Sequence, residues 1–92
     1  MELEQLRMFL AVAEAKSFSA AAKVLFVSHS TTSRAVSALE NELGTALMLR
    51  HHRTVTLTPA GEVLQREARK ILEMAEQAKE KVKSEVGVRS EE

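Results

Sequence analysis

An apolar stripe longer than a small domain can bury is the feature that most constrains this 92-residue chain. Thr58 and Pro59 predict a helix start, because a capping hydroxyl precedes proline at the first helical position. A helix over residues 59–86 would be about 42 Å long, which is more than so small a core covers. Its apolar residues follow a heptad-type spacing at Leu64, Ala68, Ile71, Ala75, Ala78 and Val82. The stripe therefore predicts contact between the helices of two copies.

Two shorter helical patterns open the chain. Apolar residues recur at helical spacing from Leu3 to Ala13, which predicts an amphipathic helix that ends near Lys16. The serines that follow break this pattern. We expect Ser19 to cap a second helix that runs to Leu25, because its hydroxyl can accept from the free amides of the next turn.

A third helix is expected between a cap at Ser28 and a stop at Gly44. Its apolar face, which we expect to be buried, consists of Thr32, Val36, Leu39 and Leu43. Its opposite face is polar to basic and consists of Ser30, Arg34, Ser37 and Asn41. Two short helices joined by a tight turn, with such an outer face on the second, match a helix-turn-helix. The periodicity alone fits a solvated helix of a three-helix bundle equally well.

After the third helix the apolar period changes to two. The first run alternates through Leu47 and Leu49 and the second through Val55 and Leu57, which predicts a β-hairpin. No Asn-Gly pair is present, so we expect a longer loop over 51–54 rather than a two-residue turn.

These elements predict a mainly α fold, a winged helix-turn-helix with a small β-hairpin wing and a long C-terminal dimerisation helix. The predicted division places the winged helix-turn-helix in residues 1–58 and the linker and dimerisation helix in residues 59–86. Residues 87–92 are predicted to form a frayed tail or the start of a linker to another domain.

Charge is balanced overall but uneven along the chain. Residues 15–61 hold five Lys or Arg against two Glu, a net charge of +3, whereas residues 1–14 carry −2 and residues 62–92 carry −1. A mildly basic middle permits a nucleic-acid-facing surface without requiring one.

Composition excludes several classes of protein. The chain has no Cys, which excludes disulfides and thiolate metal sites. No apolar run approaches the ~18 residues of a membrane span, and the acidic N-terminus is unlike a signal peptide, so we expect a cytoplasmic protein without membrane contact. No nucleophile elbow, phosphate loop or metal cage is present, so we expect no catalytic residues, cofactor or metal. The pair His51-His52 is interpreted as a solvated wing tip.

Four motifs stand out, namely SFSAAA at 17–22, VS at 27–28, SRAVSALENELG at 33–44 and VTLTPAG at 55–61. With them, residues 2–86 resemble the DNA-binding domain of LysR-type transcriptional regulators. The resemblance implies a three-helix core, a β wing and a linker helix that dimerises.

The resemblance also implies roles for single residues. Ser33 and Arg34 resemble the recognition-helix contacts, Arg53 resembles the wing arginine at the minor groove, and Ser17 and Thr31 resemble phosphate-contacting positions. The full set predicted to bind DNA is Ser17, His29, Ser30, Thr31, Ser33, Arg34, Ser37, Arg50 and Arg53.

This chain departs from the family at two places. The family commonly has Gln-Pro where this chain has His29-Ser30, and His offers no bidentate amide to adenine, so we expect a changed base preference. In the wing, Thr54 lies where glycine is usual in the turn, and Leu49 lies where glutamate is usual.

Double-stranded DNA is thus the expected partner, bound at an interrupted inverted repeat by a homodimer, with a tetramer left open for the full-length protein. Residues 29–43 would enter the major groove, and the wing at 51–54 would lie at the minor groove. The family normally carries a C-terminal domain that binds a small-molecule effector. We therefore expect these residues to be a fragment that senses no effector itself. The alternatives are a winged-helix repressor of another family and a protein-interaction module that uses its last helix as a coiled-coil adaptor.

Overall fold

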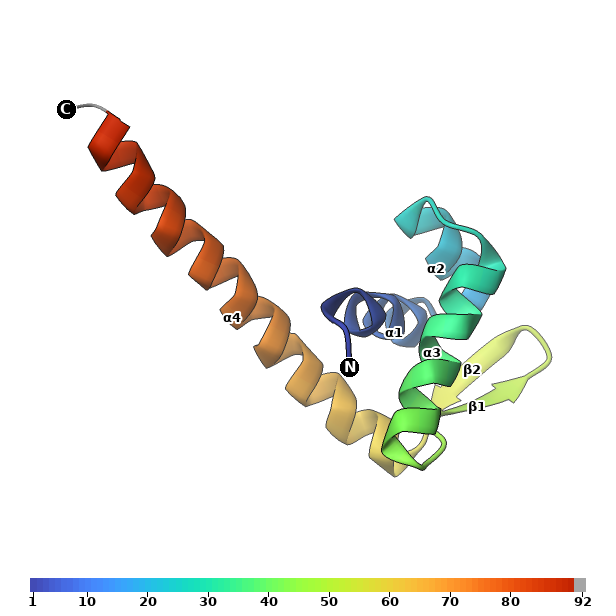
Figure 1. Cartoon of the computed structure of the whole chain (residues 1–92). Coiled ribbons are helices and arrows are strands. Elements are labelled where there is room, and N and C mark those ends of the chain that lie inside the picture. Colours follow the sequence, from blue (N-terminus) through green and yellow to red (C-terminus); the bar gives the residue numbers. More distant parts are fainter. Residues whose placement is uncertain (91–92) are drawn as a thin grey trace.

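The computed structural model describes residues 1–90, which form four helices and one antiparallel pair of strands (Figure 1). The helices are α1 (Leu3–Ala15), α2 (Phe18–Leu25), α3 (His29–Leu43) and α4 (Pro59–Ser90), and the strands are β1 (Met48–His51) and β2 (Thr54–Leu57). α4 extends far beyond the body that the other elements form, so the molecule measures 58 × 25 × 18 Å. The predicted mainly α, winged helix-turn-helix fold is confirmed. None of the helices in residues 1–90 is long and apolar enough to cross a membrane.

One apolar core joins all four helices and the hairpin. Phe9 of α1 and Leu39 of α3 are completely buried in it, and Thr32 is the buried polar residue beside them. The Thr32 hydroxyl donates to the carbonyl of His29 at 2.7 Å, so its polarity is satisfied within α3. The other core members are Leu6, Leu10, Val12, Phe18, Ala21, Val36, Leu47, Met48, Val55, Leu64 and Ala68.

The caps of the first three helices follow from local chemistry. α1 ends as predicted at Lys16, which adopts a left-handed conformation with φ 55°. The predicted cap of α2 at Ser19 was wrong by two residues. The cap is Ser17, whose hydroxyl accepts the amide of Ala20 at 3.1 Å. Phe18 is apolar and buried, so the helix begins with it and the preceding serine takes the cap position. The predicted cap of α3 at Ser28 is confirmed.

The end of α3 differs from the prediction for its buried face. Gly44 stops the helix with φ 70°, as predicted, but Leu43 is 44% exposed. Leu47 fills the core at this end instead. The carboxylate of Glu40 draws it inward, because Oε2 accepts the amides of Leu47 at 2.8 Å and of Met48 at 3.3 Å.

The hairpin is tighter than predicted. His51 pairs with Thr54, so only His52 and Arg53 connect the strands, and the expected longer loop is wrong. His52 adopts φ 56°, a conformation that His tolerates better than most residues. The Thr54 hydroxyl closes the turn by donating to the carbonyl of His51 at 3.0 Å. The position that favours glycine is therefore His52 and not Thr54.

The alternation of β1 also has the opposite phase to the one expected. Met48 is buried and Leu49 is 50% exposed. Leu47 is buried, but it precedes β1 and does not take part in the alternation of the strand. The alternation begins at Met48, so Met48 points into the core and Leu49 points outward.

α4 begins as predicted, with the Thr58 hydroxyl accepting the amide of Gly61 at 3.0 Å. The helix extends to Ser90, so the predicted boundary at residue 86 lies inside it, and the rest of the predicted tail, residues 91–92, is outside the described residues. Leu64 and Ala68, the first members of the predicted dimerisation stripe, are buried in the core of their own chain. They are corrected to core residues, and the exposed part of the stripe begins at Ile71.

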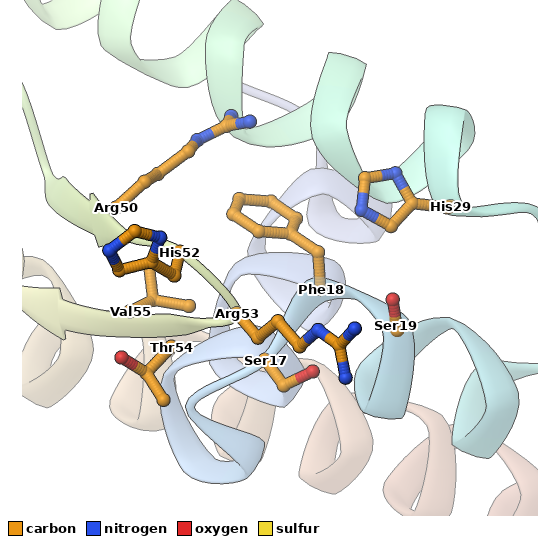
Figure 2. Close-up of a pocket in the computed structure, with 9 residues that line it drawn as sticks. All are labelled: Ser17, Phe18, Ser19, His29, Arg50, His52, Arg53, Thr54 and Val55. Carbon is orange, nitrogen blue, oxygen red and sulfur yellow. The ribbon is translucent and has the colours of Figure 1, made fainter.

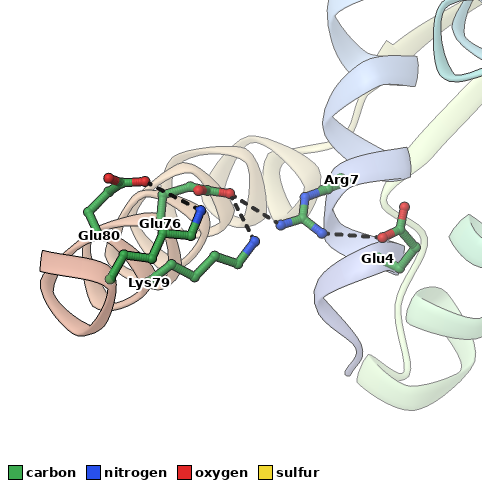
Figure 3. Close-up of polar contacts among 6 residues, drawn as sticks. Glu4, Arg7, Glu76, Lys79 and Glu80 are labelled. Carbon is green, nitrogen blue, oxygen red and sulfur yellow. Dashed lines mark hydrogen bonds and ion pairs between the residues drawn. The ribbon is translucent and has the colours of Figure 1, made fainter. Parts of the chain in front are cut away.

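Two ion pairs tie the middle of α4 to α1. Arg7 lies 3.7 Å from Glu76 and also pairs with Glu4 at 3.2 Å (Figure 3). Arg69 lies 3.8 Å from Glu14. All of these groups are at the surface, so each pair contributes little on its own. The pairs orient α4, and the buried apolar contacts hold it.

Gly61 gives the first testable prediction. A Cβ at this position would meet the carbonyl oxygen of Leu47, a backbone atom that cannot swing away. Without that contact, Gly61→Ala would stabilise α4 by about 1 kcal/mol, because Ala is the better helix former. We expect the reverse, a loss of about 1–3 kcal/mol in the free energy of unfolding measured by urea titration. A more stable variant would contradict the close packing of α4 on this carbonyl.

Candidate nucleic-acid interface

A short turn places α2 and α3 as the two halves of a helix-turn-helix. α2 ends at Leu25, its C-cap Phe26 has φ 57°, and the amide of Val27 donates to the carbonyl of Ala22 at 3.1 Å. Ser28 then caps α3, so only three residues separate the helices. The turn brings the N-terminus of α3 to the surface beside the N-terminus of α2 (Figures 1 and 2).

Hydroxyl groups cluster at the N-terminus of α3. Ser28 Oγ lies 2.7 Å from Thr31 Oγ1 and 3.1 Å from Ser30 Oγ, and it accepts the amide of Thr31 at 3.1 Å. Two predicted DNA-binding residues, Ser30 and Thr31, are thus brought together by the cap. Their hydroxyls lie where the first free amides of α3 would attract an anion.

The outer face of α3 carries the remaining predicted residues of this helix. Ser30 and Arg34 are exposed there, whereas Ser33 and Ser37 are half-buried. Arg34 and Ser37 lie outside the cleft described next, farther along the helix. Arg34 projects without a carboxylate within 4.0 Å in residues 1–90, so its fork is free to meet a ligand.

A cleft of about 540 Å³ separates the wing from the N-termini of α2 and α3 (Figure 2). It brings together four predicted DNA-binding residues from distant parts of the sequence. These are Ser17, His29, Arg50 and Arg53, and the rest of the lining is Phe18, Ser19, His52, Thr54 and Val55.

Arg50 is held inside this group of side chains. Its guanidinium lies 4.2 Å from the centre of the Phe18 ring, a cation–π contact. Its Nη2 donates to Ser33 Oγ at 3.3 Å. On the other side of Phe18, the ring of His29 lies 5.8 Å away. Phe18 therefore links two residues of the predicted site, His29 and Arg50, and Arg50 links in turn to a third, Ser33.

Sequence reasoning missed Phe18. Its signal was present, because it is the apolar residue between two serines, but the pattern was interpreted as a break between helices. The structure shows that this residue is buried and supports the cleft.

The face formed by α3 and the wing is positive and lacks compensating acid. In residues 1–90, neither Arg50 nor Arg53 has a carboxylate within 4.0 Å. Glu40, on the same helix as Arg34, is turned toward the amides of Leu47 and Met48. The same part of the chain shows no group of three His, Asp or Glu side chains placed to hold a metal ion. This surface suits a polyanion with hydrogen-bonding edges.

Comparison with known proteins identifies the family. Residues 3–62 match the family described as bacterial regulatory helix-turn-helix protein, lysR family. The HTH-type transcriptional regulator TcbR of Pseudomonas sp. (strain P51) is 49% identical over 75 residues, which cover 82% of this chain and 26% of TcbR. The chain spans about a quarter of the length of this relative.

Solved structures of the same fold include DNA complexes. The CbnR_DBD-DNA complex has a TM-score of 0.89 and 43% identity, and the match covers 94% of this chain and 99% of that one. The BenM_DBD/catB site 1 DNA complex has a TM-score of 0.87 and 39% identity, with 91% and 93% covered. From its sequence, its fold and the site between helix and wing, the chain belongs to the LysR family of bacterial regulatory helix-turn-helix proteins and comprises its helix-turn-helix domain.

Proposed function

We propose that this chain binds duplex DNA as a symmetric dimer and reads an interrupted inverted repeat in the service of transcription regulation. α3 enters the major groove and the turn of the hairpin lies at the minor groove. The observation that carries the proposal is the set of arginines on one face, Arg34, Arg50 and Arg53, without acidic partners in residues 1–90. The DNA complexes of CbnR_DBD and BenM_DBD, whose folds match this one, support it.

The contacts divide into two kinds. Ser17 and Thr31 lie at the N-termini of α2 and α3, where hydroxyls and free amides suit phosphate oxygens. Arg34 projects from the outer face of α3, where its fork can reach O6 and N7 of guanine. His29 and Ser30 stand at the leading end of the same helix and meet neighbouring base pairs. Arg53, in the wing turn, is placed to follow the narrow groove.

The dimer forms through the part of α4 that its own core leaves uncovered. Met74 is 69% exposed and Val82 is 64% exposed, and Ala78 between them and Ile71 before them lie on the same side of the helix. Ala75, half-buried, borders this stripe. The two α4 helices run antiparallel, and the two-fold axis presents two α3 helices to a two-fold DNA site. We propose that residues 1–58 form the DNA-contacting domain and that α4 forms the dimer interface.

The longer proteins of this family suggest the setting. Because the chain spans about a quarter of a relative such as TcbR, we propose that it works in a bacterial cytoplasm as one part of a regulator. A small-molecule effector then binds a separate C-terminal domain, and higher oligomers arise through that domain. A coiled-coil adaptor is the competing function, and the first experiment below distinguishes the two.

The first prediction of the proposal concerns salt. The purified chain will prefer duplexes selected for an interrupted inverted repeat over random duplexes. The logarithm of its affinity will fall by roughly 0.9 per log unit of salt for each phosphate neutralised. Fluorescence anisotropy titrations over a range of salt concentrations measure both. An affinity that is flat in salt, or the same for every sequence, would favour the adaptor.

Arg34 supplies the next prediction. Arg34→Ala will lower affinity for the best site by about 1–3 kcal/mol and relax preference at a single base pair, because a bidentate guanine contact is lost. Arg66→Ala, which removes the same side chain from the exposed surface of α4, is the matched control and will change neither quantity. An equal loss on every sequence would reassign Arg34 to a phosphate contact.

Ala78 tests the dimer. Ala78→Glu places a charge in the stripe and will give a monomer in sedimentation at micromolar concentration, because an unpaired carboxylate is costly to bury. The monomer will bind the full repeat roughly 10²–10⁴-fold more weakly and a half-site almost unchanged. Gln77→Glu adds the same group off the stripe and will remain dimeric. A dimeric Ala78→Glu variant would show that α4 pairs through another face.

A further inference from the structure

We propose that Arg50 is a positioning residue that fixes Ser33 as a hydrogen-bond donor, and that this sets which base edge α3 accepts at the position of Ser33. The inference rests on the proposed reading of DNA by α3 and deepens it. It assigns Arg50 a role in specificity through another side chain, in place of a contact of its own with DNA.

The contacts of Arg50 show how it is held. The guanidinium lies 4.2 Å from the ring centre of Phe18, which is buried, and Nη2 donates to Ser33 Oγ at 3.3 Å. β1 carries Arg50 in register with Val55, itself a buried residue of β2. The backbone and the planar head of Arg50 therefore both have partners within the chain. Its position does not depend on DNA.

The chemistry of the hydroxyl then decides what Ser33 offers outward. A hydroxyl has one proton to donate and two lone pairs that accept. A guanidinium has donors only, so the Ser33 proton cannot point toward Arg50. Its local acceptors on the helix would be the carbonyls of Ser30 and His29, three and four residues earlier. In residues 1–90, Ser33 Oγ makes neither of these bonds and is bonded to Arg50 instead. The carbonyl of His29 already accepts the helical amide and the Thr32 hydroxyl, the latter at 2.7 Å.

Ser33 thus presents its proton to the groove. Donors of this kind match guanine O6 and N7, adenine N7 and thymine O4, whereas cytosine presents the N4 amino donor. We infer that the base facing Ser33 is one with an acceptor at that point and that cytosine is excluded there. Without Arg50, the hydroxyl would rotate freely and accept from cytosine N4 as well.

The experiment compares base preferences. Duplexes with a randomised half-site are selected with the wild-type chain, with Ser33→Ala, with Arg50→Met and with the double variant. Met keeps an apolar stem over Phe18 and removes the donor. We expect Ser33→Ala and Arg50→Met each to reduce the preference for an acceptor over cytosine, at the same base position, by roughly 2- to 12-fold. The double variant should match Ser33→Ala alone, because Arg50 acts through Ser33.

Two further variants test whether the effect of Arg50 requires a side chain that can donate hydrogen bonds but cannot accept them. Arg50→Lys retains a group that only donates, so it should restore the wild-type preference. Arg50→Gln carries an acceptor beside its donor, so it should broaden the same position, and it replaces Arg50→Met if that variant fails to melt cooperatively. Arg53→Met is the matched control on the wing, which should reduce the salt slope by about 1 and leave this position unchanged.

The outcomes also separate this inference from the proposed function. If the wild-type chain shows no sequence preference, the proposed function fails. If the wild-type preference is clear but Arg50→Met weakens all sequences equally, Arg50 binds phosphate and this inference fails alone. A changed preference at a position that Ser33→Ala leaves intact would mean that Arg50 reads a base directly, which also overturns it.

Discussion

The arrangement of this domain depends on the hydrogen bonds that the carboxylate of Glu40 accepts. From the last turns of α3, it accepts the amides of Leu47 and Met48, where β1 begins. Thr58 holds the same segment from the other side, since its hydroxyl donates to Ala46 at 2.7 Å and its amide to Leu47 at 3.0 Å. Charge-assisted and backbone hydrogen bonds thus join α3, the wing and α4 at one short stretch of chain.

The arginines between α1 and α4 are paired with carboxylates, whereas, in residues 1–90, those on α3 and the wing are not. The pairs Arg7–Glu76 and Arg69–Glu14 are satisfied within the chain and lie between α1 and α4, where they orient a long helix. The arginines on the face of α3 and the wing lack such carboxylate partners in residues 1–90. A net charge of zero for the whole chain therefore conceals one face that carries three arginines without carboxylate partners in residues 1–90.

The order of the elements could be predicted from sequence because each depends on neighbouring residues. Caps such as Ser28 and Thr58 act within one helical turn, and Gly44 stops α3 through its own backbone freedom. The errors arose where distant contacts decide. Leu47 enters the core through Glu40, which reversed the expected phase of β1, and His52 accepts a conformation that a turn rule reserves for glycine.

The sequence predicted several of the residues that the structure brings together at the candidate site, but it did not predict the contacts among them. Helical spacing and family resemblance together indicated Ser33 and Arg34 on one helix and Arg53 on the wing. The stacking of Arg50 on Phe18 depends on how the hairpin folds back over α2, which no local pattern contains. Burial of Leu64 and Ala68 likewise depends on where α1 crosses α4, so one continuous stripe in the sequence divides into a core segment and an exposed segment.

The direct passage from β2 into α4 has a mechanical consequence. β2 ends at Leu57 and α4 begins at Pro59, so Thr58 alone separates the wing from a helix of 32 residues. Such a helix behaves as a stiff arm about 48 Å long. Turning it by about 5° at its base would move its far end by about 4 Å, more than the ~3.4 Å between neighbouring base pairs along one DNA strand. In the dimer that we propose, the spacing between the two α3 helices would therefore depend on how firmly the bonds of Thr58 and the buried Leu64 and Ala68 hold the base of α4.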